Sequence, residues 1–174
     1  MYCLIAAEAA IFTIFVVAYI FYIGKSQTGP QPKDVLHPPI FYSVCLLASS
    51  LTIHAAVGKL NAGNMAAFAR WWLLTILLGA MFLFGTGKEW AHLIYDEGLT
   101  VSTNLFGTTY YSLVGLHAFH VTMGLLALSL VALFLFAGRL RREHSERLEV
   151  LCMYWHFVDV VWVVVFAVVY VIGV

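Results

Sequence analysis

The stretch Tyr154–Trp162 reads YWHFVDVVW and places two ionisable side chains, His156 and Asp159, among valine, phenylalanine and tryptophan. Residues three apart lie on the same face of a helix. An isolated ionisable group is costly in hydrocarbon, so this pair must face protein, water or lipid headgroups. In the two preceding turns the same face carries Glu149 and Cys152. We therefore expect an apolar helix with one narrow polar stripe, which packs against other helices.

The whole chain is too apolar for a soluble domain. Its 174 residues are 63% apolar and only 10% charged, whereas soluble domains are about half apolar and about a quarter charged. Runs of about 18 or more apolar residues are typical of membrane-spanning helices. The chain contains five such runs, at Cys3–Ile23, Ile40–Gly58, Trp71–Gly87, Tyr110–Ala137 and Val150–Ile172. The sequence therefore predicts an all-α integral membrane protein, with residues 1–174 forming a single transmembrane domain that is a bundle of five helices.

The distribution of positive charge predicts the orientation of this bundle. Six of the nine Lys and Arg residues lie in the second and fourth connections, which are Lys59, Arg70, Arg139, Arg141, Arg142 and Arg147. Positively charged loops stay on the cytoplasmic side, so we expect the N-terminus inside and the C-terminus outside. The formal net charge of zero gives no indication of a nucleic-acid partner. The cysteines are scattered without a CxxC pair, which favours neither a disulfide nor a metal knuckle.

The acidic residue Glu8 lies inside the first apolar run, which no basic residue precedes. The run is therefore interpreted as a first span rather than a cleaved signal peptide. Two interpretations of Glu8 remain open. It is either a structural or proton-linked carboxyl buried in the span, or an interfacial residue of a span that begins later.

Histidines in the last two spans allow two interpretations as well. His117 and His120 are three residues apart on one predicted helix, and His156 lies on another. Histidines on two spans can bind haem or a metal ion. Alternatively, they form hydrogen bonds with Glu149, Asp159 or backbone carbonyls and fasten the helices together. His54 has no partner on its own helix and is interpreted as a packed polar residue.

Two further groups of polar residues lie near the ends of the spans. Glu89 and His92, at the outer end of the third span, form either a site or a solvated face. The basic residues Arg139, Arg141 and Arg142 are candidates for binding anionic lipid headgroups at the inner surface. The sequence contains no Walker, GxGxxG, GxSxG, HExxH or CxxCH motif. We therefore predict no catalytic, cofactor-binding or metal-binding residue.

Segments of all five spans, in chain order, resemble subunit III of the haem–copper (cytochrome c) oxidases. The nonapeptide Tyr154–Trp162 is similar, almost letter for letter, to the last helix of that family, and Glu149 matches a family glutamate. Weaker similarities lie in AAEAAIF at 6–12, LLASSLTIH at 46–54, GKEW at 87–90 and GLHAFHVTMG at 115–124. The chain resembles the five-helix form of the family.

The resemblance implies a non-catalytic subunit of an aerobic respiratory complex, in which oxygen reduction is coupled to proton pumping. Haem and copper would then lie in partner subunits, and this chain would bind structural phospholipids and support proton uptake. Its main partner would be subunit I, with subunit II, small subunits or a supercomplex as further neighbours. A buried polar and lipid-contact network is expected to comprise Glu8, His54, Glu89, His117, His120, Glu149, His156 and Asp159.

The resemblance favours a cytochrome c oxidase in a prokaryotic plasma membrane. A quinol oxidase is the alternative, because the electron donor is chosen by other subunits. An alternative of a different class is a small membrane protein that carries haem between two histidines.

Overall fold

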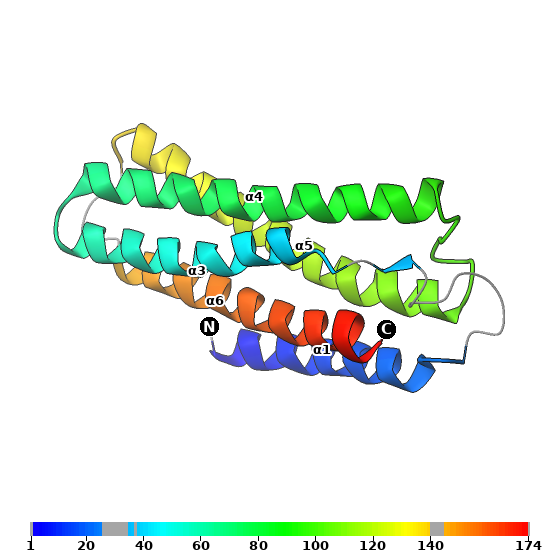
Figure 1. The fold of residues 1–174 in the computed structure, drawn as a ribbon. Helices are drawn as coiled ribbons and strands as arrows, with labels where there is room; N and C mark the ends of the chain where they lie inside the picture. The colour runs from blue at the N-terminus through cyan, green and yellow to red at the C-terminus, as the bar shows by residue number, and fades with distance from the viewer. Residues whose placement is uncertain (1, 26–34, 37, 140–144, 174) are drawn as a thin grey trace. The chain divides into compact units, whose positions relative to one another are not determined.

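The computed structural model describes residues 2–25, 35–36, 38–139 and 145–173, and it is helical throughout apart from turns and loops. Five helices are long and apolar enough to cross a membrane (Figure 1). They are α1 (Tyr2–Tyr22), α3 (Ile40–Asn61), α4 (Met65–Tyr95), α5 (Leu105–Phe136) and α6 (Ser145–Phe166). The described residues contain no strand. The prediction of an all-α membrane protein with five spans is confirmed.

Two helices extend well beyond the apolar runs that predict them. Helix α4 has 31 residues and α5 has 32, whereas about 20 residues suffice to cross the hydrocarbon core. The apolar run marks only the part of a helix that lies in hydrocarbon, and polar residues continue the same helix outside it. As a result, Glu89 and His92 lie within α4, not in the connection that follows it.

The connection between α3 and α4 is short because its residues suit both helix ends. Gly63 has a positive φ of 76°, the left-handed conformation that commonly terminates a helix. The side-chain Oδ1 of Asn64 then accepts a hydrogen bond from the backbone N–H of Ala67 at 3.0 Å, which caps the start of α4. Asn104 caps α5 in the same way through the N–H of Gly107. Asparagine is among the best residues for this role.

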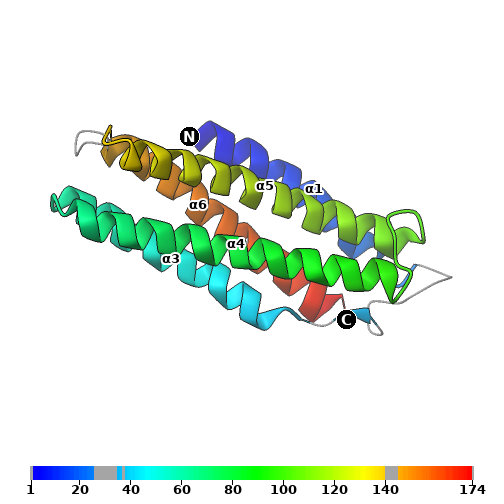
Figure 2. The same cartoon turned by 90° about the horizontal axis from the view of Figure 1, so that it is seen from above.

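The chain divides into two compact units. The first unit comprises Met1–Pro39, Gly85–Phe119 and Val160–Val174, and the second comprises Ile40–Phe84 and His120–Asp159. In the second unit, α3 lies antiparallel to the first part of α4, as Figures 1 and 2 both show. These helices are joined midway by a hydrogen bond of 2.7 Å between the hydroxyls of Thr52 and Thr75.

The packing of the second unit centres on Trp155 of α6, which is fully buried. Its indole Nε1 donates to the Ser49 hydroxyl of α3 at 2.8 Å. A Cβ added to Gly79 of α4 would lie 3.0 Å from the ring, and one added to Gly124 of α5 would lie 2.7 Å from it. These two glycines therefore let the backbones of α4 and α5 lie against the indole, as small residues do in membrane helix packing.

In the first unit, α1 packs through a few aromatic side chains. Tyr19 of α1 is almost completely buried, and its ring meets that of Phe106 edge to face, with centroids 6.5 Å apart. Near the carboxyl end, helix α6 changes to a π-helix, η2 (Ala167–Ile172). Such widened turns are rare and are often found at functional sites. The π-helix carries Tyr170, whose hydroxyl donates a hydrogen bond to Glu89.

Candidate functional site

A chain of four polar side chains connects α3 and α6 within the second unit. The thiol Sγ of Cys152 lies 3.3 Å from Nε2 of His156, and Nδ1 of the same imidazole lies 2.8 Å from the hydroxyl of Ser50. The Ser50 hydroxyl donates in turn to Oδ2 of Asp159. We call these four residues the thiol–carboxyl chain. Three of them, Cys152, His156 and Asp159, lie on the polar stripe of α6 that the sequence predicts.

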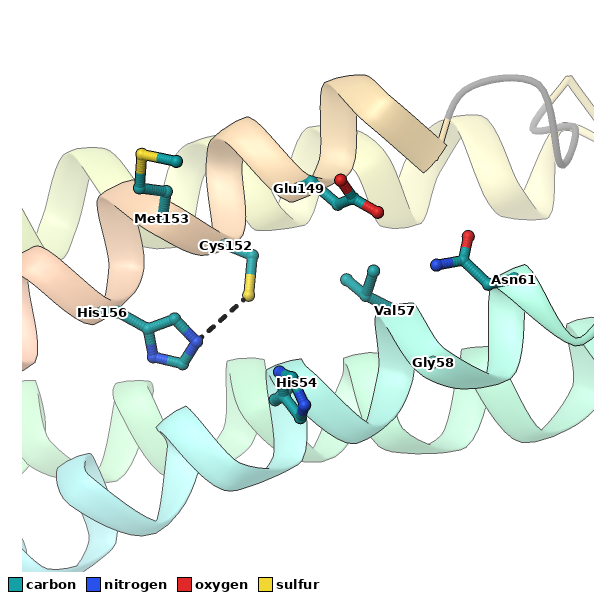
Figure 3. A pocket seen from close by; sticks show the side chains of 8 residues that line it. All are labelled: His54, Val57, Gly58, Asn61, Glu149, Cys152, Met153 and His156. Atoms are coloured by element: carbon teal, nitrogen blue, oxygen red, sulfur yellow. Dashed lines mark hydrogen bonds between the residues drawn. The ribbon is translucent and has the colours of Figure 1, made fainter. Parts of the chain in front are cut away.

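A cavity of about 420 Å³ opens beside the thiol–carboxyl chain. Its lining comes from α3 and α6 and consists of His54, Val57, Gly58, Asn61, Glu149, Cys152, Met153 and His156. Figure 3 shows the imidazole of His156 and the thiol of Cys152 on one wall and His54 on the other. The structure thus brings together three residues of the predicted polar network, His54, Glu149 and His156, in one pocket.

A second polar cluster lies in the first unit around the carboxylate of Glu89. The hydroxyl of Tyr170 donates to Glu89 Oε1 at 2.6 Å, and the hydroxyl of Tyr110 donates to the same oxygen at 3.2 Å. The three residues belong to η2, α5 and α4. Glu89 therefore links three segments of the chain. Its carboxylate is not on a solvated helix face, which was one of the two interpretations of the sequence.

Its sequence neighbour His92 has the solvated environment instead. Nε2 of His92 lies 3.9 Å from Oδ2 of Asp96, and both side chains are more than half exposed. Such exposed pairs contribute little. Glu89 and His92 therefore have different environments, although both lie on α4.

The two histidines of α5 have separate environments. The ring of His117 is fully buried and stacks on Trp162 with centroids 4.9 Å apart. The ring of Phe12 from α1 meets the same imidazole edge to face, with centroids 6.5 Å apart. His120 belongs to the second unit, where its backbone carbonyl accepts a hydrogen bond from Tyr154 at 3.2 Å.

The remaining predicted residues lie at the periphery. Glu8 of α1 is half-buried, and Arg139, just after α5, is exposed. Arg141 and Arg142 lie outside the described residues. Within the described part of the chain, no group of three or more His, Cys, Asp or Glu residues could hold a metal ion.

Comparison with known proteins identifies the family. The sequence model of the family described as cytochrome c oxidase subunit III matches residues 4–174, which is nearly the whole chain. The chain belongs to the cytochrome c oxidase subunit III family. It is therefore an integral membrane protein and a subunit of a haem–copper oxidase complex, as the sequence predicts.

Curated relatives of this subunit III come from several bacteria. Cytochrome c oxidase subunit 3 of Synechocystis is 36% identical over 95% of this chain and 71% of its own length. The protein of the same name from Corynebacterium diphtheriae is 37% identical over 84% of this chain and 71% of its own length. The cytochrome bo(3) ubiquinol oxidase subunit 3 of Pseudomonas aeruginosa is 32% identical over 95% of this chain and 80% of its own length. Relatives of both electron-donor classes thus resemble the chain.

Sequence reasoning missed several residues that contact the polar groups of this subunit III. Ser50, Trp162 and Tyr170 each contact a predicted residue directly. Ser50 lies in a segment whose small and hydroxyl residues predict close helix packing, and this was the signal available for it. Nothing in the sequence distinguishes Tyr170 from a tyrosine at the membrane interface.

Replacing Tyr170 with phenylalanine should loosen the Glu89 cluster. The change removes the shorter of the two hydroxyl hydrogen bonds to Glu89 while keeping the aromatic ring. We expect a loss of about 1 kcal/mol in the free energy of unfolding, measured on the purified protein in detergent. Tyr95→Phe is the matched control, because that tyrosine is 85% exposed. Equal stability of the two variants would contradict a structural role for the cluster.

Proposed function

We propose that this subunit III is a non-catalytic structural subunit of a cytochrome c oxidase, in which it packs against subunit I and contacts subunit II. The observation that carries the proposal is the family match over residues 4–174. Haem and copper belong, in this proposal, to the partner subunits. The polar residues of this chain fix the positions of its helices and of bound phospholipids.

The contacts described above support such a role for the polar residues. Ser50 of α3 contacts both His156 and Asp159 of α6, and Glu89 accepts hydrogen bonds from two other segments. A polar contact between membrane helices contributes about 0.6 to 2 kcal/mol. Several such contacts fix the geometry of the helices more than they add to stability. His54, Glu149, His120 and the stacked His117 belong to the same proposed network, and Glu8 and Arg139 are proposed lipid contacts.

The proposed orientation places the N-terminus inside and the chain in one transmembrane domain. Lys59 in the last turn of α3, Arg70 in α4 and the exposed Arg139 lie near the second and fourth connections. Basic residues at these positions favour the inner surface for both connections. Arg139, with Arg141 and Arg142, is proposed to bind anionic lipid headgroups there.

Changing all three arginines to glutamine should lower the amount of anionic lipid that the purified protein retains.

Purification of the intact complex tests the proposal. An affinity tag on this chain should retrieve a haem-containing subunit I from native membranes in stoichiometric amount. A copper-binding subunit II in the same preparation would establish cytochrome c as the donor, and its lack of copper would favour a quinol. Recovery of the chain as a lone, stable protein with its own haem spectrum would overturn the proposal.

A further inference from the structure

The thiol of Cys152 lines the cavity between α3 and α6 and touches an imidazole nitrogen. The proposed packing against oxidase subunits does not require a thiol beside an imidazole in a cavity. We propose that Cys152 is a nucleophilic site that forms covalent adducts with apolar α,β-unsaturated carbonyl compounds dissolved in the membrane. In this site His156 removes the thiol proton, and Ser50 and Asp159 position the imidazole.

The hydrogen bonds of the thiol–carboxyl chain set the position of each proton. Ser50 has one hydroxyl proton, which it donates to Oδ2 of Asp159. Its oxygen is therefore the acceptor in the 2.8 Å contact with His156, so Nδ1 carries the imidazole proton. Nε2 is then the unprotonated nitrogen, and it lies 3.3 Å from the thiol of Cys152. A nucleophile, a base within reach and a group that orients the base form the arrangement typical of an activated thiol.

The Asp159 carboxyl is well placed to complete this arrangement. It is only 3% exposed, and its second oxygen, Oδ1, has no hydrogen-bond partner among the described residues. Through its bond to Ser50, the carboxyl fixes the hydroxyl that holds Nδ1 of the imidazole. A buried carboxyl that holds an imidazole in one tautomer and stabilises its protonated form plays the same part in hydrolase triads.

The cavity suits a small neutral electrophile. Its volume of about 420 Å³ lies within the range of roughly 300–1,000 Å³ that is usual for small-molecule sites. Its walls are mainly apolar, and among the described residues that line it none is lysine or arginine. Nothing in the lining would therefore select an anionic compound, and an apolar one fits these walls.

Glu149 lines the same cavity and influences how the thiol reacts. A negative carboxylate beside the sulfur disfavours a free thiolate. Proton transfer to His156 must therefore accompany formation of the new bond. The Cys152 sulfur bonds to the β-carbon of the unsaturated carbonyl while Nε2 of His156 takes the thiol proton. The electron pair of the carbon–carbon double bond moves toward the carbonyl oxygen, and the resulting enolate recovers that proton from His156. The product is a neutral thioether, formed without any oxidant or reductant.

The test uses N-ethylmaleimide on the full chain in native membranes, with the rate at each cysteine measured by mass spectrometry. The three cysteines provide internal comparison. Cys45 is 8% exposed and Cys152 is 7% exposed, so the two differ in cavity and base rather than in burial. Cys3 of α1 is exposed and reports access of the reagent through the bilayer. We expect Cys152 to react at least about tenfold faster than Cys45.

Variants separate the base from simple access. His156→Gln should slow labelling of Cys152 by at least about tenfold, while the rate at Cys3 stays unchanged. His54→Gln is the matched control, because His54 lines the same cavity and, among the residues drawn in Figure 3, only His156 forms a hydrogen bond with the thiol. This change should leave the Cys152 rate within about twofold. If His156→Gln fails to accumulate, Ser50→Ala decides the question, since it removes the acceptor that holds Nδ1 and should slow Cys152 by about threefold or more.

Two results would overturn the proposal. One is labelling of Cys152 no faster than that of Cys45. The other is fast labelling that persists in both His156→Gln and Ser50→Ala, which would mean an accessible thiol without a base. Neither result bears on assembly with subunit I, which the purification experiment measures separately.

Discussion

Replacing Trp155 with alanine is expected to lower the free energy of unfolding by about 3–5 kcal/mol, the largest effect of any substitution considered. The indole is fully buried in the second unit and lies against the backbones at Gly79 and Gly124. The space it leaves cannot be filled by these glycines, because they have no side chain to move into it. The van der Waals contacts of the ring would therefore be lost outright. The loss also leaves Ser49 without the indole donor.

The measurement is a denaturation series on the purified protein in detergent, following helix content. Trp71→Ala is the control for removing a tryptophan. Trp71 is 38% exposed, so lipid or detergent can fill the space that its side chain leaves. Trp155→Phe keeps one aromatic ring but removes the Nε1 donor together with the second ring, so its loss should lie between those of the wild type and Trp155→Ala. A loss for Trp155→Ala no larger than that for Trp71→Ala would contradict the central position of this residue.

The second large effect is expected from Gly124→Ala, which should destabilise the second unit by about 1–3 kcal/mol. The added methyl group would lie 2.7 Å from the ring of Trp155, closer than carbon atoms approach one another. The ring is also held by the close approach of Gly79 and by its hydrogen bond to Ser49. It therefore cannot turn away without breaking a contact.

Gly58→Ala provides a control with the opposite sign. Gly58 lies in the last turn of α3, and a Cβ there would meet nothing within 4 Å. Alanine is a better helix former than glycine by about 1 kcal/mol, so this change should leave the protein equally or more stable. Both variants are compared in the same detergent denaturation series. Similar behaviour of the two alanine variants would show that the close approach at Gly124 has no energetic importance.

The helices of this subunit III could be predicted from the sequence because hydrocarbon imposes a simple requirement on them. Each span must be long and apolar, and the five apolar runs satisfy this. The ends of α4 and α5 were less accessible, since the residues outside the hydrocarbon are chosen by helix caps and local contacts. Asn64 and Asn104 set two of these ends, and a single asparagine is a weak signal by itself.

The site was predictable in part. The spacing of His156 and Asp159 indicated one polar face on α6, and the structure gives both residues the same partner, Ser50. That partner lies more than a hundred residues away in the chain, so helix periodicity contains no information about it. The partners of Glu89 could not be predicted from the sequence either. Its two tyrosine donors come from segments whose contact depends on the packing of the whole first unit.

The π-helix at Ala167–Ile172 has a consequence for the evolution of the carboxyl end. Because a π-helical turn holds more residues than an α-helical one, a homologue that lost one residue there would revert to a narrower spiral. A different residue of the sequence would then lie beside Glu89 in place of Tyr170. Such a homologue would keep the hydrogen bond to Glu89 only if the residue brought into that place also carried a hydroxyl.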